Sequence, residues 1–298
     1  TGLGNYVITY VPGTLTINAK PLTVTANDRS TTYGTALTLG TSLFTTSGLI
    51  NSDAVSSVTL SQASNTTIPA TQSASTYSGA NGVIPASAQG SGLSNYSITY
   101  VSGTLTVNPA TLTVTANNKS MIYGGSLPLF DATITGFVNG QNLSTSDVSG
   151  FPTLTTLATG YNGTAGSASN AGNYAIVPTQ GTLTSGNYTF NYVNGVLAVG
   201  KASITIAALN DSKVYGNTTT TAGINYTNGV AIGSAVGFVA NGLVNGDAVT
   251  SVTLTSSGAL STATVVSGPY TITPSSLAGS NSVNTNNYNV TYTGASMS

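Results

Sequence analysis

Few side chains in this sequence could do chemistry. Its 298 residues include six acidic and five basic side chains, and they include no His and no Cys. All six acidic residues are Asp, and they stand singly along the chain. General acid–base catalysis draws on a His or on paired carboxylates, and zinc sites draw on Cys and His. The composition therefore predicts a protein that is not an enzyme, that uses no cofactor and that holds no zinc.

Calcium is the one metal for which the sequence offers candidate ligands. Asp53, Asp247 and Asp211 lie in Asn-Ser-Asp, Asn-Gly-Asp and Asn-Asp segments, where backbone carbonyls could complete a site. Each segment supplies a single carboxylate, however, and Asn, Gly and Asp favour tight turns for conformational reasons alone. These three residues are calcium candidates, and a turn without an ion is the favoured interpretation of each.

Tyrosines are the other candidates, because their rings can stack on sugars or anchor an interface. Tyr77, Tyr161 and Tyr226 lie in polar stretches, so we expect them in loops, where they could contact a polysaccharide or another cell surface. Tyr96 and Tyr100, in contrast, fall on the apolar face of an alternating stretch, and we expect both rings in a core.

The charge balance argues against two classes of partner. The net charge is −1, and charged side chains make up 4% of the residues, far below the usual share of roughly a quarter. This composition gives no electrostatic basis for binding nucleic acid. The chain also lacks a run of about 18 apolar residues, the length that marks a membrane-spanning helix. We therefore expect neither nucleic acid nor a membrane span.

These residues are set in a repeated sequence. The text of Asn95–Gly124 ends one module and begins the next, and nearly the same text occurs at 5–34 and 187–216. Its Tyr-Gly pairs stand 90 and then 92 residues apart, at Tyr33, Tyr123 and Tyr215. This period indicates small domains in series, since solenoid repeats are about 20–50 residues long. We expect a closing hairpin of a preceding repeat at 1–19 and repeat domains at 20–109, 110–200 and 201–298. The chain is expected to be an excerpt of a longer protein.

Alternation inside each module predicts β-strands. Leu112, Val114 and Ala116 alternate with threonines, which is the period-two pattern of a half-buried strand. The stretch Tyr96–Val107 is predicted to be a hairpin that closes one domain. The connection Asn108-Pro109-Ala110 then leads to the next domain with little slack. The sequence thus predicts an all-β chain of small β-sandwich or β-grasp-like domains in an elongated rod.

Helix is disfavoured, because good helix formers such as Glu, Gln, Lys and Arg are nearly absent. We expect at most a short helix per domain, near 51–55 or 245–249, where Asn or Asp could cap a first turn. The third domain carries an insertion near 217–241. Surface loops accept insertions at small entropic cost, so we expect a surface loop there that could make a domain-specific contact.

The ordered set of these motifs resembles the MBG-type repeats, of the Tyr-Gly variety, found in large bacterial surface exoproteins. The resemblance rests on the Tyr-Gly pairs, on Ala-Lys-Pro-Leu-Thr-Val-Thr-Ala-Asn at 19–27, on Gly-Leu-Val-Asn-Gly-Asp at 242–247 and on Gly-Pro-Tyr-Thr-Ile-Thr-Pro at 268–274. It covers essentially the whole chain. It implies β-rich modules, immunoglobulin-like or β-grasp-like, in the stalks of adhesins and biofilm matrix proteins. Two features depart from the pattern: the scarcity of charge, and Gln141, which stands where Asp53 and Asp247 stand in the other domains.

The function expected on this basis is structural. The chain is predicted to be a non-enzymatic stalk or spacer of a secreted bacterial adhesin or matrix protein, located at the cell surface, whose partners are the neighbouring repeats of the same chain. A subunit of a self-assembling extracellular filament or sheath is an alternative, because few like charges would oppose lateral packing. A carbohydrate-binding surface module that uses the loop tyrosines is another.

Overall fold

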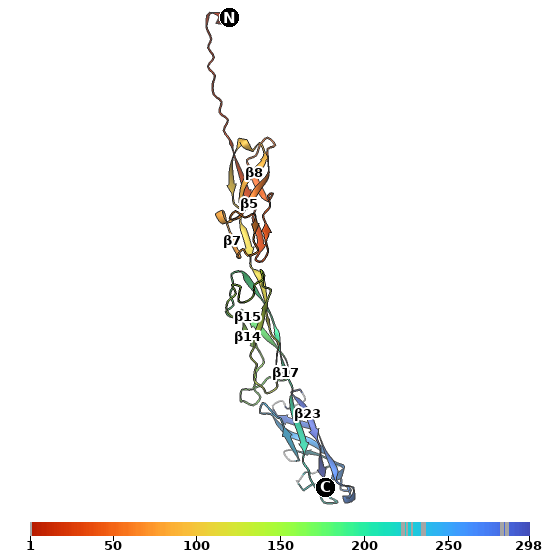
Figure 1. Cartoon of the computed structure of the whole chain (residues 1–298). Helices are drawn as coiled ribbons and strands as arrows, with labels where there is room; N and C mark the ends of the chain where they lie inside the picture. Colours follow the sequence, from red (N-terminus) through yellow and green to blue (C-terminus); the bar gives the residue numbers. More distant parts are fainter. Residues whose placement is uncertain are drawn as a thin grey trace. The chain divides into compact units, whose positions relative to one another are not determined.

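The computed structural model describes residues 2–221, 224, 226–227, 229–233, 237–280, 283 and 286–298 (Figure 1). In these ranges the chain is built of β-strands and turns, and its helical segments are 3-10 turns of three residues each. These turns are η1 (Leu3–Asn5), η2 (Gly79–Asn81), η3 (Leu93–Asn95), η4 (Ser257–Ala259) and η5 (Val265–Ser267). The prediction of an all-β chain is confirmed.

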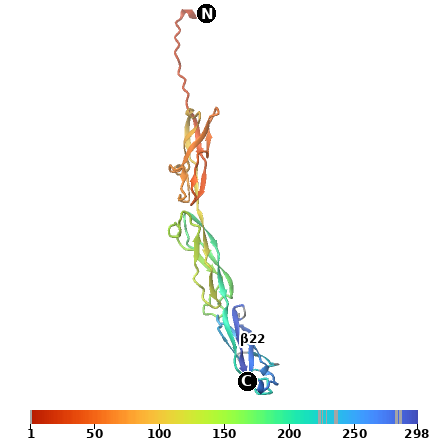
Figure 2. The same ribbon diagram turned by 45° about the vertical axis from the view of Figure 1, so that its right-hand side comes forward.

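The strands fall into three successive groups. The first comprises β1 (Lys20–Ala26), β2 (Arg29–Thr32), β3 (Leu37–Thr38), β4 (Phe44–Ser47), β5 (Ala54–Ser61), β6 (Thr67–Ile68), β7 (Ser75–Tyr77), β8 (Ile84–Ser91), β9 (Tyr96–Val101) and β10 (Leu105–Asn108). The second comprises β11 (Ala110–Ala116), β12 (Lys119–Ile122), β13 (Ala132–Thr135), β14 (Thr153–Thr156), β15 (Gly172–Thr179), β16 (Tyr188–Val193) and β17 (Gly195–Gly200). The third comprises β18 (Ala202–Ala208), β19 (Val230–Gly233), β20 (Phe238–Asn241), β21 (Ala248–Thr255), β22 (Tyr270–Ser280), β23 (Tyr288–Thr293) and β24 (Ala295–Met297). In Figure 1, β5 and β8 are labelled on the orange part of the ribbon and β23 on the blue part. Figure 2 labels β22.

Contacts divide the chain into two compact units. Unit 1 consists of Thr1–Leu112, Gly136–Ser149 and Thr184–Thr189, and unit 2 consists of Thr113–Thr135, Gly150–Leu183 and Phe190–Ser298. The division runs through the second group of strands. The contacts between the first and second groups described below lie inside unit 1, and those between the second and third groups lie inside unit 2.

Apolar–hydroxyl alternation explains why the first strand of each group forms. In β1, Leu22, Val24 and Ala26 are at most 3% exposed, while the intervening Thr23 and Thr25 are only partly buried. Strands β11 and β18 show the same alternation. Burying a Val or Leu side chain contributes about 1.5–3 kcal/mol, so these inner faces hold the strands in place. The β-branched threonines suit the outer face of a pleated strand.

Each group forms two main sheets, in the manner of a small β-sandwich. In the first group these sheets have the orders β4-β1-β9 and β2-β10-β7, with β3-β6 and β5-β8 as further pairs. The second group has β13-β11-β16 and β12-β17-β15-β14, and the third has β20-β18-β23 and β19-β21-β22-β24. Residues of both main sheets are buried, such as Val24 in one and Leu105 in the other. Of the two predicted fold types, the arrangement is therefore the sandwich.

The predicted closing hairpin at 96–107 is wrong. Strand β9 pairs in parallel with β1, while β10 lies in the other sheet, where it pairs in parallel with β2. The chain crosses between the sheets at Gly103, whose N–H and C=O both bond to Val83, at 2.9 and 2.8 Å. A Cβ at Gly103 would lie 2.6 Å from the carbonyl oxygen of Ala26, so only glycine fits this crossing. Alternation predicted both strands correctly, but it does not specify their partners.

The segment expected to be a closing hairpin at 1–19 also forms no strand within its described residues, 2–19. Its apolar side chains are exposed, for example Tyr10 at 86% and Ile17 at 89%. In each full group the equivalent strand, such as β9, pairs with the first strand of its own group. Residues 2–19 pair with no such first strand, so the same sequence pattern forms no sheet there.

Neither predicted helix is present. Asn51 and Ser52 have left-handed backbone angles, with φ of 56° and 63°, and β5 begins at Ala54. Asn245 and Gly246 adopt the same conformation, with φ of 58° and 71°, and β21 begins at Ala248. An Asn or Asp that could cap a helix can also form a left-handed turn, and here the turn is formed.

The insertion near 217–241 is not simply a surface loop. Strand β19 pairs with β21 and extends a sheet, and Ile224, Tyr226 and Ala231 are buried. Residues 222, 223, 225, 228 and 234–236, which belong to the stretch expected to make a domain-specific contact, lie outside the described residues.

Candidate functional site: the Tyr-Gly junctions

Tyr33 joins the first group of strands to the second. It directly follows β2, and its N–H donates to the carbonyl oxygen of Asn108 at 2.8 Å. Its ring is 5% exposed and meets the ring of Tyr188 edge-on, with centroids 5.4 Å apart and planes at 84°. The hydroxyls of Tyr33 and Tyr188 both donate to Oε1 of Gln141, at 3.3 and 2.7 Å. One acceptor oxygen from the second group therefore binds a tyrosine from each group.

A glycine-rich loop positions Gln141. Gly136, Asn139 and Gly140 have positive φ angles, which reverse the chain after β13. The N–H of Gln141 donates to the carbonyl oxygen of Val138 at 3.0 Å, and the N–H of Val138 donates to the hydroxyl oxygen of Tyr188 at 3.1 Å. The loop and the tyrosine thus hold each other in position.

Gly34 allows the two groups to approach closely. A Cβ built on it would lie 2.6 Å from the side chain of Val138, and its φ of 92° already disfavours any other residue. The N–H of Gly34 and Nδ2 of Asn139 both donate to the carbonyl oxygen of Ala70, at 2.9 and 3.1 Å. The Tyr-Gly pair therefore supplies an aromatic ring and, next to it, a residue without a side chain against which Val138 packs.

A second polar contact lies beside the ring pair. The N–H of Ala74, just before β7, donates to Oδ1 of Asn187 at 2.8 Å. Asn187 directly precedes Tyr188, and its carbonyl oxygen accepts from the N–H of Ala110 at 3.0 Å. The Asn-Tyr sequence that opens β16 thus contacts the preceding group through both residues.

The same arrangement recurs between the second and third groups, inside unit 2. Tyr123 and Tyr288 are 2% and 1% exposed, and their rings meet edge-on with centroids 5.5 Å apart at 82°. Both hydroxyls donate to Oδ2 of Asp247, at 3.1 and 2.7 Å. Nδ2 of Asn245 donates to the hydroxyl oxygen of Tyr123 at 2.8 Å. Asp247 thus occupies the position that Gln141 holds in the first junction.

The surrounding contacts repeat as well. A Cβ at Gly124 would lie 2.5 Å from Val244, and the N–H of Val244 donates to the hydroxyl oxygen of Tyr288 at 3.1 Å. The N–H of Ala171 donates to Oδ1 of Asn287 at 2.9 Å, as Ala74 does to Asn187. Two junctions of similar design therefore occur in one chain. They differ in the acceptor and in the partner of the loop asparagine, because Asn139 donates to Ala70 and Asn245 donates to Tyr123.

Burial favours the protonated form of three junction hydroxyls, those of Tyr123, Tyr188 and Tyr288. Desolvation raises the pKa of Tyr123 and of Tyr288, and the nearby carboxylate of Asp247 raises both further. Desolvation also raises the pKa of Tyr188. A protonated hydroxyl can donate, so at neutral pH the tyrosines serve as donors to one shared acceptor.

We call the loop that carries Gln141 or Asp247 the acceptor loop. The third Tyr-Gly pair packs against no acceptor loop among the described residues. Tyr215 is 64% exposed, and a Cβ at Gly216 would meet nothing within 4 Å. The equivalent loop of the first group carries Asp53, and no Tyr-Gly pair of the described residues packs against it. There Tyr96 donates to Oδ2 of Asp53 at 2.9 Å and accepts from the N–H of Ile50 at 2.9 Å, and Ile50 is 48% exposed.

Each calcium candidate accepts hydrogen bonds from donors of its own repeat or of a neighbouring one. Asp53 and Asp247 accept hydrogen bonds from tyrosine hydroxyls, in different repeats. Oδ1 of Asp211 accepts from the N–H of Ser212 at 2.8 Å and from Oγ1 of Thr221 at 3.0 Å. Across the described ranges, no three acidic side chains gather into a group that could hold a metal. Asp53 and Asp247 therefore act as hydrogen-bond acceptors for tyrosine hydroxyls.

The contact tyrosines have different surroundings. Tyr161 is 39% exposed, and the hydroxyl of the partly buried Tyr77 donates to the carbonyl oxygen of Ser73 at 2.8 Å. Tyr226 is 1% exposed, and its burial raises its pKa to about 12. The expectation that Tyr226 lies in an accessible polar loop is therefore wrong, because the insertion folds inward. Tyr100 differs in the other direction: it was expected in a core and is 38% exposed, and its hydroxyl oxygen accepts from the N–H of Ala88 at 2.9 Å.

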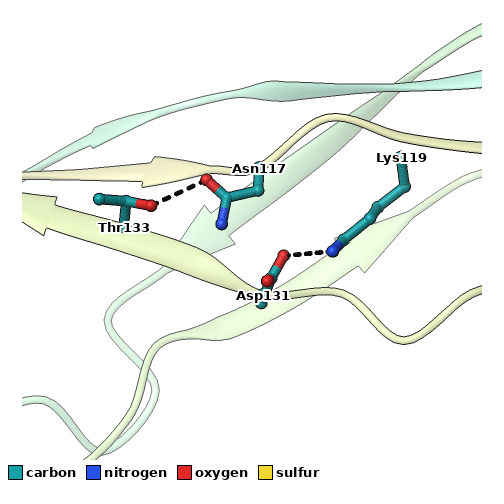
Figure 3. Close-up of polar contacts among 4 residues, drawn as sticks. All are labelled: Asn117, Lys119, Asp131 and Thr133. Carbon is teal, nitrogen blue, oxygen red and sulfur yellow. Dashed lines mark hydrogen bonds and ion pairs between the residues drawn. The ribbon is translucent and has the colours of Figure 1, made fainter.

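A surface ion pair illustrates how little charge contributes to this fold. Nζ of Lys119 lies 2.7 Å from Oδ1 of Asp131, and Thr133 donates to the side chain of the neighbouring Asn117 (Figure 3). The hydrogen bond from Lys119 lowers the pKa of Asp131, but the carboxylate side chain is 57% exposed. Exposed pairs of this kind contribute little stability.

The sequence carries a signal for the junctions that the residue types alone do not reveal. The Tyr-Gly pair and the Gly-Leu-Val-Asn-Gly-Asp segment recur together in the repeats, and Gln141 stood out as a replacement of Asp. What the spacing could not show is that the pairs at Tyr33 and Tyr123 contact the acceptor loop of the following repeat. In the described part of the chain, no helix has the length and apolar character needed to cross a membrane.

Comparison with known proteins adds one finding. The family model described as MBG domain (YGX type) matches residues 22–106, 112–198 and 204–298. The comparisons with curated proteins and with solved structures found no match.

Proposed function

The chain belongs to the family of MBG domains of the YGX type, and from this premise we propose that it is a non-enzymatic spacer in a bacterial surface adhesin or matrix protein. Its task is to hold functional parts of a larger protein at a distance from the cell. The resemblance to surface exoproteins supports the location, and the low share of charged residues supports a structural role.

The observation that carries this proposal is the repetition of the junction. A flexible string of domains needs only a polar linker between its members. Here each linker is accompanied by two interlocked tyrosine rings, a shared acceptor and a glycine packed against a valine. Such contacts restrict bending between successive repeats, which is the property that a spacer requires.

Small-angle X-ray scattering of the full chain tests this proposal. A spacer should give a distance distribution that one extended conformation fits. Tyr33→Ala and Tyr123→Ala should each broaden the distribution, because either removes one ring pair. Tyr10→Ala is the matched control, since Tyr10 is 86% exposed and outside both junctions. A distribution for the unaltered chain as broad as that of freely jointed domains would contradict the proposal.

The location has a separate test. Antibodies raised against the chain should label intact cells that express it, and external protease should remove the label without lysis. Labelling only after permeabilisation would contradict the surface assignment and would leave the mechanical proposal in place.

A further inference from the structure

The first and the last strands of the first group run side by side in the same direction. Strand β1 pairs in parallel with β9 in one sheet, and β2 pairs in parallel with β10 in the other. In both pairs the partners stand 76 positions apart in the sequence, as Lys20 and Tyr96 do. Residues 20–32 and 96–108 therefore form one parallel pair that passes from sheet to sheet together, and we call this pair the clamp.

Hydrogen bonds join the two segments of the clamp where they change sheet. The N–H of Arg29 donates to the carbonyl oxygen of Thr104 at 2.8 Å, and the N–H of Thr104 donates to Oδ1 of Asp28 at 2.6 Å. At the end of β2, the N–H of Tyr33 donates to the carbonyl oxygen of Asn108 at 2.8 Å. The side chain of Asp28 thus links the segments between the two ladders of backbone bonds.

The same arrangement recurs in the other two groups. Strand β12 pairs in parallel with β17, and β18 pairs in parallel with β23. Oδ1 of Asn118 accepts from the N–H of Val196 at 2.7 Å, and Oδ1 of Asn210 accepts from the N–H of Ser296 at 2.8 Å. A parallel pair with a side-chain acceptor at the crossing is therefore a common feature of the three groups.

The clamp determines how tension on the chain acts on a repeat. The chain enters the first group at Lys20 and leaves it at Asn108, and because the segments are parallel these residues lie at opposite ends of the clamp. Tension therefore acts along the strands and loads the evenly spaced bonds of the parallel pair together. We infer that the repeats are load-bearing elements whose clamps resist extension in shear. This inference deepens the proposed function and rests on it, because a spacer between a cell and its attachment is under tension.

Single-molecule force measurements on the full chain test the inference, and the absence of native Cys lets introduced cysteines define the two points of pulling. Pulling between Lys20→Cys and Asn108→Cys loads the clamp along its strands. Pulling between Lys20→Cys and Ser97→Cys separates the same strands from one end, because Ser97 lies opposite Pro21. At one pulling speed the first geometry should need a several-fold larger force, since forced unfolding follows the unfolding rate in that geometry. Urea unfolding of the two variants should coincide.

Substitution of Asp28 tests the side-chain link. Asp28→Ala should lower the force in the first geometry and leave it unchanged in the second, because peeling begins at the opposite end of the clamp. Asp28→Asn keeps Oδ1 as an acceptor, as Asn118 and Asn210 do, and should keep the force.

Equal forces in the two geometries would overturn the inference, and so would an Asp28→Ala variant that keeps its full force in the first geometry. The spacer proposal is judged separately, since scattering measures the chain without load. An extended chain that yields equally in both geometries would refute the clamp alone.

Discussion

The two internal junctions have the same geometry and different acceptors. In the first, a neutral amide oxygen of the half-buried Gln141 accepts from Tyr33 and Tyr188. In the second, a carboxylate oxygen of Asp247, 8% exposed, accepts from Tyr123 and Tyr288. The ring pairs are nearly superimposable in their internal geometry, at 5.4 and 5.5 Å. The comparison teaches that the junction requires an acceptor oxygen at this point and does not require a charge.

The charge has a cost and a benefit. Hydrogen bonds to a carboxylate are stronger than those to an amide, but burying a carboxylate is unfavourable unless it is well solvated by donors. Oδ1 of Asp247 is buried and makes no hydrogen bond, so all of its donors act on Oδ2. Gln141 avoids this cost and forms a longer bond to Tyr33, at 3.3 Å. The second junction is thus the one more sensitive to losing its acceptor.

Removing the acceptor should give the largest difference. Asp247→Ala removes the carboxylate to which two buried hydroxyls donate and should lower the free energy of unfolding by about 3 kcal/mol. Gln141→Ala should cost about 1 kcal/mol, because a half-buried site admits water to the hydroxyls. Urea unfolding of both variants measures this difference, with Lys119→Gln as a surface control. Equal losses would mean that the acceptor's charge and burial do not matter.

Glycine substitutions should separate a packed Tyr-Gly pair from an exposed one. Gly124→Ala combines a backbone strain of about 1 kcal/mol with a steric clash of similar size, for a total of about 2 kcal/mol. Gly216→Ala, with a φ of 89° and open space around it, should cost only the strain, about 1 kcal/mol. Thermal unfolding of the two variants gives the comparison. A Gly216 variant as damaging as the Gly124 variant would show that Gly216 is packed in solution.

Alkaline pH should weaken the second junction. Below pH 10, the ordinary tyrosine pKa, both states keep their hydroxyls protonated and stability is constant. Above it the unfolded chain releases protons that folded Tyr123 and Tyr288 retain, because their pKa values are raised. The free energy of unfolding should therefore fall by about 1 kcal/mol per pH unit for each such tyrosine until the folded pKa is reached. Unfolding between pH 8 and pH 11 checks this, and the slope should decrease in Tyr123→Phe. A slope that is unchanged in this variant would contradict the assignment to Tyr123.

Loss of one hydroxyl should give the smallest effect. Tyr123→Phe removes a donor to a carboxylate and should cost about 1.5 kcal/mol, whereas Tyr33→Phe removes a long bond to an amide and should cost about 0.5 kcal/mol. Both variants keep the ring pair, so the scattering profile should not change. A larger loss for Tyr33→Phe would reverse the order of strength proposed for the two junctions.

The sequence predicted the strands and the family well, because both depend on local or repeated patterns. Leu22, Val24 and Ala26 are buried as their alternation predicted. Strand partners were not predictable in the same way. The stretch 96–107 alternates like a hairpin, yet its two strands enter different sheets because Gly103 turns the chain across the sandwich. Period-two patterns report which face is buried and carry no information on which strand lies alongside.

The candidate site was partly visible. The repeat aligns Asp53, Asp247 and Gln141 as equivalent positions, but for the two aspartates it suggests only a turn or calcium. The donor that Asp247 takes from the preceding repeat, Tyr123, is 124 residues away in the sequence. Tyr226 was misplaced because a polar neighbourhood in sequence does not exclude burial once an inserted segment pairs with a sheet. Long-range contacts of this kind depend on the three-dimensional structure.

A double-mutant cycle on Tyr123 and Asp247 tests the central claim most directly, since the two residues belong to successive repeats. Unfolding free energies would be measured for the unaltered chain, Tyr123→Phe, Asp247→Ala and the double variant. If the junction is formed as described, the two losses should be non-additive by about 1–2 kcal/mol. Losses that add to within about 0.3 kcal/mol would contradict a contact between the repeats at this point.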